Sequence, residues 1–182
     1  MANIVLGVTG SIAAYKAAQM ASTLRGKGHE VQAVITECGL KFITADTFLA
    51  LTKRRALTDL FDANDEFNPL HVSLSEWADL ILIAPATANT IGKIACGLAD
   101  DVLSCAVMAT RCPIIIAPAM NDLMWGNSAV QRNVGTLKEM GIRFIEPESG
   151  RLASGKIGTG RLADVAKIIE MVESVLKETK KG

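Results

Sequence analysis

The run PAMNDLMW at residues 118–125 directly follows an apolar stretch that predicts a buried strand. The side chain of Asn121 can both donate and accept hydrogen bonds, so it could hold a carboxylate. Met120 and Met124 offer polarisable apolar surface to a ring or a chain. An N-capping asparagine followed by core methionines would give the same letters. The meaning of the motif therefore depends on the loops that share its end of the sheet.

Two other loops place small polar residues directly after apolar runs, TGSIAA at 9–14 and PATANT at 85–90. In the first, Gly10 lets the backbone approach a ligand, and free amides at the helix start favour an anion such as phosphate. In the second, hydroxyl and amide groups could lie against a flat polar ring. Each loop could also be only a capped helix start. Together they suggest a mononucleotide with one phosphate and one planar ring.

Two single residues leave further alternatives open. Glu37 follows the second apolar run and could bind a ribose, which keeps a nicotinamide dinucleotide possible although the G-x-G-x-x-G fingerprint is absent. His71, which we expect in a loop ahead of the third apolar run, could act as an acid, a base or an anion holder. A lone histidine is, however, more often a surface or packed core residue.

The glycine-rich segment 148–164 predicts a long connection that closes over a substrate, or else an exposed mobile loop. Arg151, Lys156 and Arg161 within it could meet an anionic group. Such a segment can act as a flap only if a rigid scaffold positions it.

The scaffold follows from short, nearly continuous apolar runs that alternate with helical spacing. We predict strands at 3–8, 30–36, 79–85, 113–118 and 142–146. We predict helices at 11–28, 87–110, 127–141 and 162–180. This order indicates a single doubly wound α/β domain over residues 1–182, Rossmann- or flavodoxin-like, with about five mainly parallel strands and helices on both faces. Ligands bind beyond the carboxyl ends of such strands, where the polar loops lie.

Bulk composition excludes several classes. The 19 basic and 19 acidic residues cancel, so we expect no nucleic-acid or membrane partner. No apolar run approaches the roughly 20 residues that span a bilayer, and no signal-peptide pattern is present, which indicates a cytoplasmic protein. The cysteines have no metal-like spacing, so we expect reduced, buried thiols and no metal site. They are Cys38, Cys96, Cys105 and Cys112.

These motifs, with a histidine ahead of WADLILIAP and above all PAMNDLMW, resemble the flavin-dependent cysteine decarboxylases. Within them the chain is most similar to the free-standing branch that acts on phosphopantothenoylcysteine in coenzyme A biosynthesis. The resemblance covers nearly the whole chain. It implies FMN as cofactor, phosphopantothenoylcysteine as small-molecule substrate, and a homo-oligomer built on trimers, up to a dodecamer, with the active sites at subunit interfaces.

The implied reaction yields 4'-phosphopantetheine. Loss of carbon dioxide from a cysteine amide leaves a carbanion without an electron sink. Oxidation of the thiol to a thioaldehyde supplies that sink, decarboxylation then gives an enethiol, and re-reduction gives the saturated thiol.

The resemblance also implies residue roles. His71 is the catalytic histidine, Asn121 holds the substrate carboxylate, and residues 148–162 form a flexible substrate clamp. The implied cofactor contacts are Gly10, Ser11, Ile12, Thr36, Phe42, Thr87, Ala88, Asn89, Thr90 and Ala119. The implied substrate contacts are Lys16, Asn121, Met124 and Lys156.

One position departs from the pattern. Ser154 stands where relatives in this branch carry a cysteine that donates the last proton, and serine is a far weaker acid. We expect full turnover with Ser154, or a water that it holds, relaying the proton. The alternatives are an oxidative peptidyl-cysteine decarboxylase that releases the enethiol, a flavin prenyltransferase, and a non-catalytic regulatory flavoprotein.

Overall fold

The central feature is a five-stranded sheet in the order β2-β1-β3-β4-β5, in which every pairing is parallel. The computed structural model describes residues 1–60 and 70–179. The strands are β1 (Asn3–Val8), β2 (Glu30–Ile35), β3 (Leu80–Ala86), β4 (Ile114–Pro118) and β5 (Arg143–Phe144). The predicted doubly wound fold is confirmed. The strand order reverses between β1 and β3, which is where such folds leave a crevice for a ligand.

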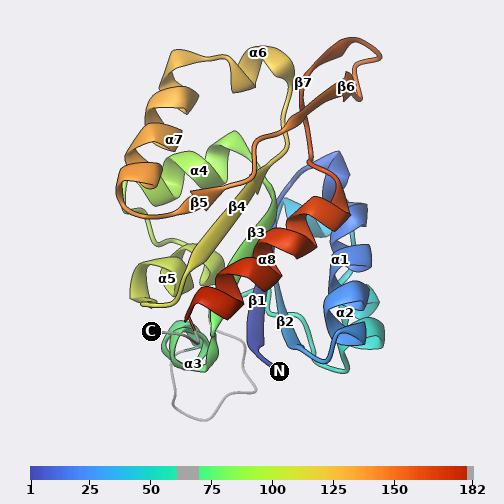
Figure 1. Cartoon of the computed structure of the whole chain (residues 1–182), viewed down its shortest axis with the longest axis vertical. Helices are drawn as coiled ribbons and strands as arrows, with labels where there is room; N and C mark the ends of the chain where they lie inside the picture. The colour runs from blue at the N-terminus through green and yellow to red at the C-terminus, as the bar shows by residue number, and fades with distance from the viewer. Residues whose placement is uncertain (61–69, 180–182) are drawn as a thin grey trace.

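Helices cover both faces of the sheet (Figure 1). One face carries α1 (Tyr15–Gly26), α2 (Ala45–Thr52) and α8 (Val165–Thr179). The other carries α3 (Leu70–Trp77), α4 (Ala88–Ala95), α5 (Val102–Ala109) and α7 (Ser128–Glu139). Side chains of β1 alternate between the two cores, with Leu6 in one and Val5 in the other. The strands β1, β3 and β4 are therefore apolar on both faces, as their nearly continuous apolar sequences predicted.

Two helix predictions need correction. Residues 87–110 were predicted as one helical stretch but form α4 and α5, because Gly97 adopts a φ of +69° and Asp101 starts a new helix with a capping box. His71 was predicted in a loop but lies in α3. The loop prediction is wrong because Leu74 and Ala78, four residues apart, both bury in the core. Residues 67–69 of that stretch lie outside the described residues.

The glycine-rich segment is an antiparallel hairpin of β6 (Glu148–Arg151) and β7 (Ile157–Arg161) rather than an irregular connection. Figure 1 shows it beyond the sheet, near the short helix α6 (Asp122–Trp125). A further correction concerns the thiols, because Cys38 and Cys96 are exposed and the other two are half-buried. No helix within residues 1–60 and 70–179 is long and apolar enough to cross a membrane.

Candidate functional site

A cavity of about 1060 Å³ lies at the carboxyl ends of β1 and β3, where the strand order reverses. Its wall is built by the loops after β1, β2, β3 and β4, by the connection between α4 and α5, and by the β6–β7 hairpin. This volume is at the upper end of the range of small-molecule and cofactor sites. The polar loops singled out in the sequence therefore converge on one cavity.

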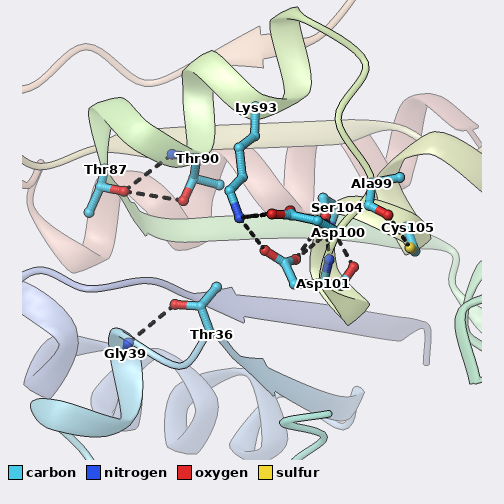
Figure 2. Close-up of polar contacts among 10 residues, drawn as sticks. All are labelled: Thr36, Gly39, Thr87, Thr90, Lys93, Ala99, Asp100, Asp101, Ser104 and Cys105. Atoms are coloured by element: carbon cyan, nitrogen blue, oxygen red, sulfur yellow. Dashed lines mark hydrogen bonds and ion pairs between the residues drawn. The ribbon is translucent and has the colours of Figure 1, made fainter. Parts of the chain in front are cut away.

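The loop after β1 packs tightly on the turn after β2. A Cβ at Gly10 would lie 2.5 Å from the Cβ of Cys38, and one at Gly39 would lie 2.6 Å from the carbonyl oxygen of Val8. The Gly39 amide donates to Thr36 Oγ1 at 3.2 Å (Figure 2). This close approach leaves the helix start after Gly10 as a backbone-lined cradle that suits an anion.

A buried threonine joins the loop after β1 to the loop after β3. The Thr9 hydroxyl donates to the Pro85 carbonyl at 2.7 Å, and its oxygen accepts from the Thr87 amide at 3.0 Å. Thr87 in turn caps α4, because its Oγ1 accepts from the Thr90 amide at 3.3 Å (Figure 2). The first turn of α4 is thus held beside the cradle as a second wall.

Asn121 caps a helix, as its sequence allowed, and also lines the cavity. Its Oδ1 caps α6 by accepting from the Leu123 amide at 3.0 Å. Its Nδ2 has no hydrogen-bond partner among residues 1–60 and 70–179, and the residue lines the cavity. Met124 also lines the cavity and is 48% exposed, so it is not a core methionine. The site therefore presents an oriented amide donor beside apolar surface.

The hairpin rests on the loop that carries Asn121. The Met120 amide donates to the Gly160 carbonyl at 2.9 Å. At the hairpin tip, the Leu152 amide donates to the Lys156 carbonyl at 2.8 Å, which closes a tight turn with Ser154 against the cavity. The base of the hairpin is thereby joined to the β4 loop, while its tip faces the open space.

Ion pairs connect neighbouring elements at two places, between α4 and α5 and at the base of the hairpin. Lys93 Nζ donates to Asp100 Oδ1 at 2.7 Å and to Asp101 Oδ2 at 3.1 Å, which joins α4 to the start of α5 (Figure 2). The hydrogen bond that Lys93 donates to Asp100 raises the pKa of Lys93. At the hairpin base, hydrogen bonds from Lys167 and Arg161 lower the pKa of Glu148 to about 2.

Residues 1–177 match the model of a known protein family, described as Flavoprotein. The chain belongs to the Flavoprotein family. Among its curated relatives, the coenzyme A biosynthesis bifunctional protein CoaBC of Bacillus subtilis (strain 168) is 42% identical over 97% of this flavoprotein and 43% of the relative. The protein of the same name from Mycolicibacterium smegmatis (strain ATCC 700084 / mc(2)155) is 41% identical, and the match covers 96% of this chain and 42% of the relative. The chain thus spans less than half the length of these relatives.

Solved structures agree with this family. A PPC decarboxylase mutant complexed with pantothenoylaminoethenethiol matches with a TM-score of 0.86 and 34% identity over 97% of this chain and 98% of that chain. The FMN-dependent cysteine decarboxylase SpaF matches with a TM-score of 0.86 and 36% identity, and the match covers 98% of this chain and 97% of SpaF. These matches confirm the resemblance seen in the sequence and support a flavin as the cofactor.

Most of the site residues expected from the sequence meet at the cavity of this flavoprotein. Those that line it are Gly10, Ser11, Ile12, Lys16, Thr36, Thr87, Ala88, Asn89, Thr90, Ala119, Asn121, Met124 and Ser154. Phe42 and Lys156 do not line it within the described part of the chain. Sequence reasoning missed Lys93 and its two aspartates. The spacing of Lys93 one turn after Asn89 was the available signal, because both then lie on one side of α4.

His71 also does not line the cavity of a single described chain. Its helix α3 ends beside the amino end of β1, where Asn3 Nδ2 donates to the Trp77 carbonyl at 3.0 Å. Figure 1 shows α3 at the end of the sheet opposite the hairpin. The fold of one chain therefore does not bring His71 to the other site residues.

Proposed function

We propose that this flavoprotein is an FMN-dependent decarboxylase that converts 4'-phosphopantothenoylcysteine to 4'-phosphopantetheine. The observation that supports it best is the meeting of three features at one cavity: the glycine cradle, the Nδ2 group of Asn121, which has no hydrogen-bond partner within the described residues, and the hairpin tip with Ser154. The structural likeness to a PPC decarboxylase over nearly the whole chain favours this substrate.

The residues present fit FMN. The cradle at Gly10 has room for a phosphate against backbone amides, and the short contact between Gly10 and Cys38 leaves no space for a side chain there. Thr36, Thr87 and Asn89 supply hydroxyl and amide groups along the same wall. When bound, FMN supplies a two-electron acceptor and donor for the substrate thiol.

The residues of the chain then act on the substrate. Asn121 Nδ2 donates to the carboxylate and orients it for departure, while Met124 packs against the apolar part of the substrate. The hairpin covers the cavity and excludes water. Ser154, at its tip, delivers the last proton directly or through a water that it holds.

His71 reaches the site from a neighbouring copy in this proposal. Within one chain it lies on α3, away from the cavity, so its catalytic role requires a homo-oligomer, a trimer that can assemble further into a dodecamer. Exposed apolar residues around the cavity suit such an interface, since 60% of Ile12 and 64% of Tyr15 is accessible in the single chain.

The decisive assay gives purified holoprotein phosphopantothenoylcysteine and follows carbon dioxide, product mass and the flavin spectrum. We expect a yellow protein, release of carbon dioxide, and the saturated thiol as product. A protein that acquires no flavin spectrum with FMN, or that binds a nicotinamide dinucleotide instead, contradicts the cofactor. Absence of carbon dioxide from a flavin-loaded protein contradicts the substrate.

A second candidate function is oxidative decarboxylation of a cysteine in a peptide. Ser154 favours it, because its hydroxyl is a poor proton donor. The product distinguishes the two, since the enethiol is lighter than the thiol by the mass of two hydrogens.

A further inference from the structure

Two cations on the cavity wall are already committed to carboxylates. Lys93 is held by Asp100 and Asp101 at 2.7 and 3.1 Å, and these aspartates line the cavity with it. Arg161 donates to Glu148 at 3.0 Å. Their positive charge is therefore largely neutralised within the protein, and recruiting either for a ligand would break an existing pair.

Two other cations on the same wall are uncommitted. Lys16, in the first turn of α1, and Arg151, at the end of β6, make no ion pair and no side-chain hydrogen bond within residues 1–60 and 70–179. The carboxylates of the described lining are Glu37, Asp100 and Asp101, and the last two are paired with Lys93. Lys16 on α1 and Arg151 on the hairpin are therefore the lining cations that can meet an anionic ligand group without breaking an ion pair.

We propose that Arg151 is the specificity-determining residue that binds the phosphate monoester of the substrate, opposite Lys16. This assignment rests on the proposed function. Lys156 and Arg161 are less suited to bind this phosphate, because Lys156 does not line the cavity and Arg161 is already paired with Glu148. The planar guanidinium of Arg151 offers paired N–H donors that match a phosphate better than an ammonium does.

The position of Arg151 gives this contact a second consequence. Arg151 is the last residue of β6 and pairs with Ile157, so it immediately precedes the tight turn that carries Ser154. A phosphate bound by Arg151 would therefore also help to fix the position of the turn that carries Ser154. Loss of this remote contact should therefore lower kcat as well as raise KM for the phosphorylated substrate.

FMN carries a phosphate too, so the test separates the two sources. Wild type, Arg151→Met, Arg151→Lys and Lys156→Met are compared in kcat/KM for phosphopantothenoylcysteine and for pantothenoylcysteine. We expect the preference for the phosphorylated substrate to fall by on the order of tenfold to a hundredfold in Arg151→Met, with partial retention in Arg151→Lys and no fall in Lys156→Met. FMN and riboflavin titrated into apoprotein should keep their wild-type affinity ratio.

Other results overturn the assignment. If Arg151→Met lowers the FMN-to-riboflavin affinity ratio and leaves the substrate preference intact, Arg151 binds the cofactor. An unchanged preference, or one lost only in Lys156→Met, also refutes it. If wild type decarboxylates neither substrate, the proposed function fails. Calorimetry of phosphopantetheine and pantetheine binding to holoprotein then tests the subsite alone, which stands only if Arg151→Met selectively weakens the phosphorylated molecule.

Discussion

The Met120 amide donates a 2.9 Å hydrogen bond to the Gly160 carbonyl, which joins the loop of Asn121 to the strand that leads from the Ser154 turn. A Cβ at Gly160 would overlap the carbonyl oxygen of Met120, and one at Gly158 would lie 2.8 Å from the Cβ of Asp122. Glycine is therefore required for β7 to lie against this loop. The hairpin and the Asn121 loop are thus joined by close packing and a hydrogen bond.

Gly160→Ala should misplace Asn121 without touching the cofactor cradle. Because the new Cβ meets backbone atoms, the Met120 loop must shift, and misplacing an orienting group by about 1 Å can cost up to roughly a hundredfold in rate. We expect kcat to fall about tenfold or more while FMN affinity stays within about twofold of wild type. Steady-state kinetics measure kcat, and titration of flavin fluorescence measures the FMN affinity.

The matched control is Gly135→Ala in α7, where a Cβ meets nothing within 4 Å. It should leave kcat unchanged and stabilise the protein by about 0.5–1 kcal/mol. Equal loss of activity in both variants, or wild-type kcat in Gly160→Ala, contradicts the mechanical coupling.

Asp101→Ala should destabilise the protein more than Asp100→Ala. Both aspartates pair with Lys93, but Asp101 Oδ1 also accepts from the Ser104 amide at 2.8 Å and caps α5. Loss of such a cap costs about 1 kcal/mol. Urea unfolding midpoints of the two variants check the order. Equal midpoints would show that the Lys93 pair, not the cap, carries the effect.

Glu148 should stabilise the hairpin base in a pH-dependent way. Hydrogen bonds from Lys167 and Arg161 hold its pKa at about 2, below the ~4.3 of an unfolded chain. Its contribution is therefore fully present above about pH 5 and is lost as the pH falls toward 2. Glu148→Gln should be less stable than wild type at pH 7, and the difference should shrink at pH 4 and 3.

The control for this pH dependence is Glu139→Gln, which removes an exposed carboxylate that makes no ion pair within residues 1–60 and 70–179. Its difference from wild type should not change with pH. A Glu148→Gln difference that is equally large at pH 3 and pH 7 contradicts the assigned role.

Much of the sheet and cavity was predictable because burial on both faces leaves a continuous apolar signal. The loops after β1, β3 and β4 could then be placed together, since parallel strands end at one edge. The hairpin was missed because Gly158 and Gly160 carry poor strand propensity, and only their close fit against Asp122 and Met120, respectively, explains them.

Other features depend on contacts that no local pattern contains. Lys93 meets Asp100 because the chain turns at Gly97 between two helices, a break that helical spacing alone did not predict. The placement of His71 is a similar case. Its assigned role came from the resemblance, and the described part of the chain does not bring it to the cavity.

Variants at Ser154 test the proton relay. If Ser154 relays the last proton, Ser154→Ala should accumulate the enethiol and leave the flavin reduced, while Ser154→Cys should keep or raise formation of the saturated thiol, because a thiol is the stronger acid. The product mass in single-turnover experiments shows whether each variant forms the enethiol or the saturated thiol. Wild-type behaviour of Ser154→Ala would assign the proton to water or another hairpin group and leave Ser154 as a small residue in a tight turn.

Mixed oligomers test whether His71 acts across an interface. His71→Asn and Asn121→Asp should each nearly abolish decarboxylation and keep FMN, because both act on substrate. If each site combines Asn121 of one copy with His71 of the next, co-refolding the two variants in equal amounts restores about a quarter of the sites by random assembly. Decarboxylase assays before and after mixing, with the oligomer size checked by light scattering, measure the recovery. Two His71→Asn preparations mixed in the same way are the control and should gain nothing. If the mixed variants stay inactive although exchange is complete, both residues must come from one chain, and the interface role of His71 is wrong.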